Sequence, residues 1–290
     1  MHPSRLLALV IAATFSSYSL AADVIALSRE GRGVETVDAT VAGKPGKYLF
    51  DSGIGTSGIT PDVARSIQCT PWGKVTGFRA TGERMDVPRC NGASVSLGGT
   101  SIKLAQLSVF DLATFMGPAA QGLSGALGLD VFDGRTVTLN IAEHQLVVET
   151  DESLAAIKAH AIEVPVRLVR AAEGAALTVS LGLPTASGTL WMELDTGNYG
   201  PSLVDTTAAP LLGLDASNPH PQQFKAHVAA DVEIDDVAVV KPLIMDGNLG
   251  RGVLHHWKLT LDLAHRKGWI VVRPLTFNDE VKSMAKRLGS

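Results

Sequence analysis

Phe50-Asp51-Ser52-Gly53 and Leu194-Asp195-Thr196-Gly197 are the two stretches that decide the fold of this 290-residue chain. Each Asp-Ser/Thr-Gly triplet follows an apolar, strand-forming run, so each aspartate is expected at the end of a β-strand. Two such turns facing each other would bring two carboxyl groups into one site, where both cannot ionise easily. A pair of this kind holds an acid and a base side by side.

Each triplet also stands at the end of a predicted hairpin. The strands and turns are Val34 to Val41, Gly43 to Gly46 and Lys47 to Phe50 in the first half, and Ala176 to Leu181, Pro184 to Gly188 and Thr189 to Leu194 in the second. Both halves therefore place the aspartate after the second strand of a hairpin.

A second repeated element follows each triplet. Leu127-Gly128 precedes a strand at Thr136 to Asn140, and Leu249-Gly250 precedes a strand at Lys258 to Asp262, at a constant offset. Repetition on this scale indicates two related halves. The first half is about 22 residues longer between triplet and Leu-Gly, and the surplus falls near Val75 to Val87. We expect an additional hairpin there. Long loops of this kind often bind substrates.

Taken together, these elements resemble the pepsin- and retropepsin-like aspartic peptidases, especially the bacterial secreted two-lobed members. The resemblance covers Val34 to Val272 and implies an all-β fold of two barrel-like lobes with the active-site cleft between them. It implies that Asp51 and Asp195 are the catalytic pair.

The same resemblance assigns supporting roles. Ser52 and Thr196 would hydrogen-bond across the pair, and Gly53 and Gly197 would let the backbone approach the carboxyl groups. The segment Gly77-Phe78-Arg79-Ala80-Thr81-Gly82 would form the flap over the substrate. The chain departs from the family pattern at Ile54 and Asn198, directly after the triplets, and at Asn248, where the first half has Ala126.

The implied activity is that of an endopeptidase that hydrolyses peptide bonds with water activated between the two aspartates. We expect a peptide or protein substrate, no cofactor and no metal. The alternative is a catalytically silent protease-like domain that binds peptides or envelope components, because a fold does not guarantee a function.

The composition and the N-terminal residues indicate the broad class of the protein and its location. An apolar fraction of 46% and a charged fraction of 19% are typical of a globular protein. With a net charge of −4, the chain lacks the excess of basic residues that is typical of proteins that bind nucleic acid. Residues 1–22 have the pattern of a signal peptide whose apolar core is too short to cross a bilayer. We therefore predict an exported monomer, periplasmic or secreted, with no membrane span.

The predicted segments are a signal peptide (1–22), an N-terminal lobe with the flap (23–150), a linker (151–160), a C-terminal lobe (161–275) and a polar tail (276–290). The two cysteines, Cys69 and Cys90, either form one disulfide or remain as buried free thiols. They are too few for a metal site.

Three rival patterns carry less weight. Gly53 to Gly58 fits the dinucleotide-binding pattern GxGxxG, but no second strand ending in an acidic residue follows it. Gly122 to Ala126 almost matches the serine-hydrolase motif GxSxG and lacks its last glycine. His255, His256 and His265 could suggest a metal, yet adjacent residues on a strand point to opposite faces.

Overall fold

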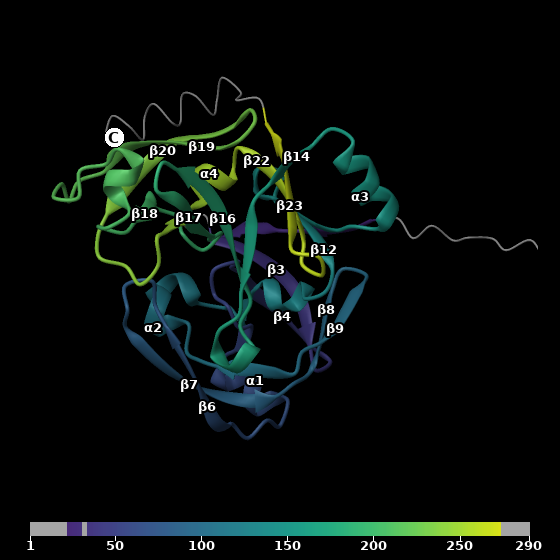
Figure 1. Ribbon diagram of the computed structural model, residues 1–290. Coiled ribbons are helices and arrows are strands. Elements are labelled where there is room, and N and C mark those ends of the chain that lie inside the picture. The colour runs from purple at the N-terminus through teal and green to yellow at the C-terminus, as the bar shows by residue number, and fades with distance from the viewer. Residues whose placement is uncertain (1–21, 31–33, 274–290) are drawn as a thin grey trace, which may run out of the picture.

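The computed structural model describes residues 22–30 and 34–273, and strands dominate this part of the chain (Figure 1). The strands form three sheets, one in each half of the chain and a third to which both halves contribute. The all-β, two-lobed, pepsin-like fold predicted from the sequence is confirmed. The predicted signal peptide, apart from its last residue, and the predicted polar tail lie outside the described residues.

The first lobe is built on a ten-stranded sheet in the order β6-β7-β10-β5-β11-β4-β3-β8-β9, with β2 paired to β3. Its strands are β2 (Ser28–Glu30), β3 (Val34–Val41), β4 (Lys44–Phe50), β5 (Gly58–Ile59), β6 (Trp72–Phe78), β7 (Arg84–Asn91), β8 (Ser94–Leu97), β9 (Thr100–Lys103), β10 (Gln106–Val109) and β11 (Gly125–Leu127). Its helical segments are α1 (Pro61–Ser66), α2 (Ala113–Met116) and the 3-10 turns η1 (Gly117–Ala120) and η2 (Leu129–Phe132). Helix α1 begins where the Thr60 hydroxyl accepts from the Val63 amide, with Pro61 at the first helical position.

The second lobe has a seven-stranded sheet in the order β15-β16-β17-β21-β18-β20-β19. Its strands are β15 (Val166–Val169), β16 (Thr178–Thr185), β17 (Gly188–Leu194), β18 (Ser202–Val204), β19 (Gln222–Ala229), β20 (Val232–Val240) and β21 (Gly247–Leu249). Its helical segments are η4 (Ala172–Gly174), η5 (Ala209–Leu212) and α4 (Arg251–Leu254).

The third sheet joins the lobes in the order β1-β13-β12-β22-β23-β14. Its strands are β1 (Asp23–Ala26), β12 (Thr136–Asn140), β13 (Gln145–Val148), β14 (Ile162–Val164), β22 (Trp257–Asp262) and β23 (Lys267–Val272), with the 3-10 turn η3 (Ile141–Glu143) after β12. At its centre β12 pairs with β22, so that Thr138 lies opposite its own repeat equivalent, Thr260. Their hydroxyl oxygens are 2.8 Å apart, which places the pseudo-two-fold axis of the molecule between them.

The internal repeat is visible in the pairing of the strands. In the first lobe β4 runs parallel to β11, β11 antiparallel to β5, and β5 parallel to β10. In the second lobe β17, β21, β18 and β20 repeat these three relations in the same order. The two lobes therefore have the same strand topology, and the triplets occupy equivalent positions in it.

The additional residues of the first lobe are distributed differently from the sequence-based expectation. We predicted that they form one extra hairpin near Val75 to Val87, and β6 and β7 do pair there. The second lobe, however, has its own hairpin of β19 and β20, and the first lobe also inserts the hairpin β8–β9. The additional residues of the first lobe therefore lie in strand β6 and in the hairpin β8–β9. The expectation of a single hairpin was wrong because chain length alone does not show where insertions fall.

In the sequence, helix α3 (Asp151–Lys158) separates the two lobes and falls within the segment predicted as linker. The Thr150 and Ser153 side chains each accept from the other residue's backbone amide and so cap it. In the part of the chain that the structure describes, no helix is long and apolar enough to span a membrane.

Candidate active site

Both triplets leave their strands in the same way. The amide of Asp51 donates to the carbonyl of Leu127, and the amide of Asp195 donates to the carbonyl of Leu249, each over 3.0 Å. The repeated Leu-Gly elements therefore fix the start of each triplet turn from the neighbouring parallel strand. This explains why the triplet and the Leu-Gly element are repeated together.

The second residues of the triplets hold the two turns against each other. The Ser52 amide donates to Thr196 Oγ1 and the Thr196 amide donates to Ser52 Oγ, both over 2.9 Å. The Ser52 hydroxyl donates in turn to the Leu194 carbonyl at 2.6 Å. Because Ser52 and Thr196 are fully buried, no water can replace these bonds, and each lobe fixes the turn of the other.

The third residues must be glycine because each faces the opposite carboxyl group. A Cβ on Gly53 would lie 2.6 Å from Asp195 Cγ, and a Cβ on Gly197 would lie 2.5 Å from Asp51 Cγ. Contacts this short exclude any side chain. The structure therefore brings both aspartates and all four supporting residues of the sequence-based prediction into one site.

The two carboxyl groups form a coupled pair. Burial is the main reason that the pKa of Asp51 lies well above its usual range, and the negative charge of Asp195 raises it further. The two carboxyl groups face each other, since each lies against the glycine of the opposite triplet.

The two aspartates differ in the number of donors around them. Asp51 Oδ1 accepts from the Gly53 amide at 2.8 Å. Asp195 Oδ1 accepts from the Gly197 amide at 2.8 Å and the Asn198 amide at 3.1 Å, and Asp195 Oδ2 accepts from the side chain of Asn248 at 2.7 Å. The carboxyl group of Asp195 therefore accepts more hydrogen bonds from neutral donors than the carboxyl group of Asp51 does.

Asn198 and Asn248, which we noted in the sequence as departures from the family pattern, form part of this asymmetry. Asn198 Nδ2 donates to Asn248 Oδ1 at 2.9 Å, which turns the Asn248 amide nitrogen toward Asp195. The sequence contained the signal, a polar residue at the position of Ala126, but it did not show that this residue would contact Asp195.

Below the first triplet lies a buried carboxyl group that the sequence analysis missed. Ser57 donates to Asp130 from its hydroxyl at 2.5 Å and from its amide at 2.7 Å. Burial raises the pKa of Asp130 to about 6, although the bonds from Ser57 oppose this shift. The Ser57 hydroxyl also accepts from the Gly128 amide at 2.9 Å, so the pair ties the first Leu-Gly element to the segment after the triplet.

A second missed group of residues links the lobes beside the Asp195 turn. The fully buried Glu35 accepts from Arg251 at 2.5 Å and lies 3.1 Å from His144 Nδ1. The Glu35 amide donates to the Tyr199 hydroxyl at 3.0 Å, and the guanidinium of Arg251 lies 5.1 Å from the centre of the Tyr199 ring. Strand β3 of one lobe and helix α4 of the other thus meet next to the second triplet.

The predicted flap is the hairpin of β6 and β7, with its tip at 79–83. At the tip, the amide of Ile244 in the second lobe donates to the carbonyl of Ala80 at 2.9 Å. Gly82 has φ +94° and lies against the Ile244 side chain. Phe78 is exposed. The flap therefore extends from the first lobe to the second and contacts it directly.

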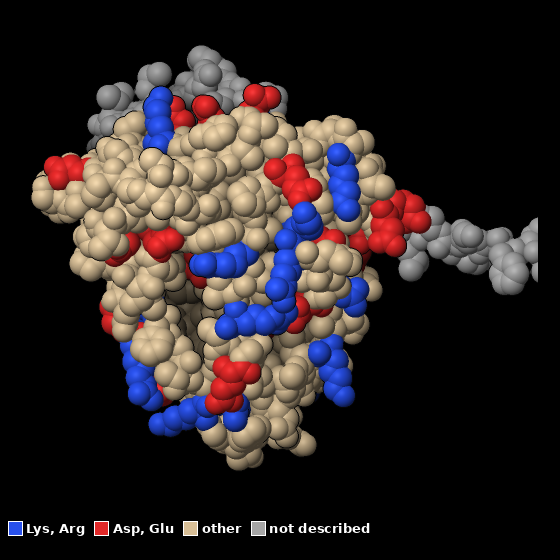
Figure 2. Space-filling model, in the orientation of Figure 1, with Lys and Arg blue, Asp and Glu red and all other residues tan. Residues whose placement is uncertain are grey.

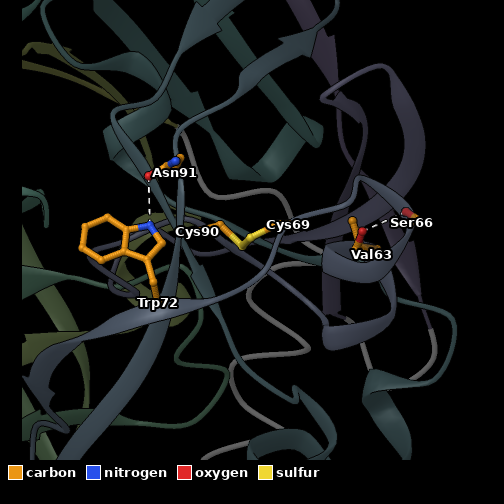
Figure 3. The surroundings of a disulfide bond; sticks show 6 residues. All are labelled: Val63, Ser66, Cys69, Trp72, Cys90 and Asn91. Atoms are coloured by element: carbon orange, nitrogen blue, oxygen red, sulfur yellow. Dashed lines mark hydrogen bonds between the residues drawn. A yellow bond between two sulfur atoms is a disulfide. The ribbon is translucent and has the colours of Figure 1, made fainter.

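Cys69 and Cys90 form a disulfide at the base of the flap (Figure 3). Cys69 follows helix α1 and Cys90 lies near the end of β7, where the indole of Trp72 also donates to Asn91 Oδ1 at 2.9 Å. The disulfide anchors the flap strand β7 to the body of the first lobe.

The rival patterns are accounted for by structure. Gly58 of the GxGxxG pattern faces the ring of Phe110, with no room for a Cβ, and the pattern lies in a β-sheet lobe instead of a βαβ unit. His265 hydrogen-bonds Asp262 at the turn between β22 and β23. Among the described residues, no three His, Cys, Asp or Glu side chains are grouped as metal ligands would be.

The surface near the middle of the face drawn in Figure 2 is hollowed, and Lys, Arg, Asp and Glu side chains are interspersed around the hollow. Of the pockets elsewhere, one of about 280 Å³ lies between flap strand β7 and helix α2 and is lined in part by Met85, Phe110 and Phe115. Another, of about 550 Å³, lies at the hairpin of β3 and β4. Neither is lined by Asp51 or Asp195.

Two lobes with the same pattern of strand pairing, and a pair of carboxyl groups between them, are the features expected of a pepsin-like fold. A family model described as aspartyl protease matches residues 37–131, which include the first triplet and the flap. Over this segment the chain is similar to aspartyl proteases. No curated protein sequence matches the chain.

Two solved structures share the fold over most of the chain. The basic 7S globulin from soybean has a TM-score of 0.55 at 9% identity, covering 86% of this chain and 94% of the globulin. Conglutin gamma, a basic 7S globulin from lupine seeds, has a TM-score of 0.53 at 9% identity, covering 92% of this chain and 98% of the lupine protein. At this identity the likeness concerns the fold alone.

Proposed function

We propose that the chain is an aspartic endopeptidase that hydrolyses peptide bonds with a water molecule activated between Asp51 and Asp195. The observation that carries this proposal is the carboxyl pair itself, held by reciprocal Ser52–Thr196 bonds and closed in by Gly53 and Gly197. Turn chemistry alone does not account for two half-buried acids side by side, because burying unpaired charge is unfavourable.

The surroundings of the two acids support a division of roles. Burial and the charge of Asp195 both raise the pKa of Asp51, which favours its protonated form. Asp195 has the donors that stabilise a carboxylate. We therefore assign the proton to Asp51 and the negative charge to Asp195 in the resting site.

The reaction follows from that assignment. Asp195 removes a proton from the water while the water oxygen attacks the peptide carbonyl carbon, and Asp51 donates its proton to the carbonyl oxygen. The resulting tetrahedral intermediate has two hydroxyl groups. Asp51, now ionised, takes back the proton of one hydroxyl as the carbonyl re-forms, and Asp195 passes its proton to the departing amine nitrogen. The C–N bond breaks, and the resting state is restored.

Cleavage of a peptide library from pH 3 to 7 tests the proposal. The variants Asp51→Asn and Asp195→Asn should each lose activity, and pepstatin should inhibit the wild type. Asp38→Asn, which changes an exposed carboxylate on β3, is the matched control and should cleave normally. Undiminished cleavage by either dyad variant would refute the mechanism.

A second candidate function is peptide binding without cleavage. It is favoured by the bond from Ile244 to Ala80, which joins the flap tip to the opposite lobe. Under this alternative the wild type cleaves no peptide over the whole pH range, yet retains peptides in an equilibrium binding measurement.

We also propose export to the periplasm or the medium, and action as a monomer. The disulfide between Cys69 and Cys90 supports export, because such bonds persist in oxidising compartments. N-terminal sequencing of the purified protein should begin at Asp23, and its detection only with Met1 intact in the cytoplasm would contradict export.

A further inference from the structure

A third carboxyl group stands beside the proposed catalytic pair. On strand β17 the side chains alternate, with Met192 and Leu194 buried and with Trp191 and Glu193 half-buried on the same side as Asp195. The equivalent position in the first lobe, two residues before Asp51, is Leu49, which packs in an apolar cluster with Leu112 and Ala126. The two lobes therefore offer the pair chemically different neighbours.

Asn248 connects Glu193 to the pair. Its side-chain nitrogen donates to Asp195 Oδ2 at 2.7 Å and to Glu193 Oε2 at 3.3 Å. Asn198 fixes the orientation of the Asn248 amide from the other side. One amide group thus bridges the two carboxyl groups, and both lose this arrangement if Asn248 turns.

The charged groups around Glu193 are few. Its own strand supplies Asp195 and the first lobe supplies Asp51. Strand β16 presents the hydroxyl of Thr178, which hydrogen-bonds Glu193. Strand β15 contributes Arg167, which is exposed and stacks at 4.8 Å on the ring of Trp191. No Lys or Arg in the described part of the chain forms an ion pair with Glu193.

These surroundings couple the ionisation of Glu193 to that of Asp51. Burial, followed by the charge of Asp195, raises the pKa of Glu193 to about 7. The charge of Glu193 in turn contributes to the raised pKa of Asp51. The charge of an ionised Glu193 therefore opposes the loss of a proton from Asp51.

We propose that Glu193 is a positioning residue for the catalytic pair, which through Asn248 and its own charge keeps the shared proton on Asp51 at higher pH. The site would then remain active closer to neutral pH than the two aspartates alone allow. This inference rests on the proposed peptidase function. It predicts a one-sided effect, because Glu193 is uncharged at the acid end of the profile, where Asp195 must ionise.

The profile of kcat/KM against pH from 3 to 9 provides the test, with Glu193→Gln as the variant. Gln keeps the size of the side chain and an acceptor for Asn248. We expect the alkaline limb to move down by about one pH unit, as for a single charge several ångströms away, and the acid limb to stay in place. An unmoved alkaline limb, or an equal shift of both limbs, would overturn the proposal.

Glu149→Gln is the matched control, since Glu149 is also half-buried and also accepts from two side chains. Its donors are Thr138 at 2.5 Å and Ser153 at 2.6 Å, but it lies directly after β13 of the sheet that joins the lobes. Neither limb should move in this variant. If Glu193→Gln does not fold, Glu193→Leu, which copies Leu49, takes its place with the same expectation.

A second readout separates this inference from the peptidase proposal. Titration of ¹³C-labelled carboxyl groups by NMR follows the protonation of Asp51 whether or not the protein cleaves peptides. Asp51 should lose its proton at lower pH in Glu193→Gln than in the wild type. Absence of hydrolysis with this shift would defeat only the proposed function, whereas hydrolysis without the shift would defeat only the role of Glu193.

Discussion

Replacing Thr196 by Val removes one hydroxyl from the centre of the molecule and leaves the volume of the side chain nearly unchanged. The Ser52 amide, which now donates to that hydroxyl at 2.9 Å, would be left without an acceptor in a site that is fully buried. A buried donor left unsatisfied costs about 1–3 kcal/mol. We expect the free energy of unfolding to fall by about 2 kcal/mol, equivalent to a decrease in Tm of about 4–8 °C for a chain of this size.

The same substitution should reduce catalysis. Ser52 and Thr196 each set the turn that carries an aspartate, and small displacements of reacting groups lower rates steeply. We therefore expect kcat/KM to fall by about tenfold or more. Urea unfolding, followed by circular dichroism, and hydrolysis of a chromogenic peptide measure the two effects on one preparation.

Thr260→Val is the matched control, because Thr260 is equally buried and its hydroxyl also bonds across the pseudo-two-fold axis, to Thr138. It loses a bond between two neutral side chains, worth about 1 kcal/mol, and should keep wild-type kinetics. If Thr196→Val is no less stable than Thr260→Val and cleaves peptides at the normal rate, then the reciprocal bonds do not hold the site together.

Three further outcomes are expected. Replacing Cys69 and Cys90 together by Ser should lower the free energy of unfolding by about 3 kcal/mol, measured in urea, because the unfolded chain loses a loop constraint. Asp130→Asn should flatten the dependence of stability on pH. The raised pKa of Asp130, about 6, means that its protonated form stabilises the fold below about pH 4 and that this contribution, roughly 3 kcal/mol, disappears as pH rises through 6; an equal slope in wild type and variant would count against it. Ile244→Pro removes the amide that donates to Ala80 and should speed hydrogen exchange at the flap tip, whereas Ile244→Ala should leave it slow.

Much of the fold could be predicted because its signals are local. The triplets follow β-rich runs, and glycine- and proline-containing turns mark the hairpins, so the predicted strand at Thr189 to Leu194 is observed as Gly188–Leu194. Repetition of Leu-Gly gave the two-lobed arrangement. These features depend on residues that are close in the sequence, so one sequence alone is sufficient to recognise them.

The parts that were missed depend on contacts between distant residues. Asn248 reaches Asp195 across two parallel strands, and Glu35 meets Arg251 across the two lobes. No local pattern marks either contact. The joining sheet was missed for the same reason, since its strands come from the beginning, middle and end of the described chain.

The joining sheet also decides when the site can exist during synthesis. Strand β22 pairs with β12 of the first half, and β23 holds β14, which precedes the second lobe. Both β22 and β23 come after residue 256, well beyond Asp195 in the sequence. A growing polypeptide therefore contains Asp51 and Asp195 before it contains the strand β22 that pairs with β12 and joins the two lobes. A polypeptide that stops before residue 257 would carry both aspartates without the strand pair β12–β22 that joins their lobes.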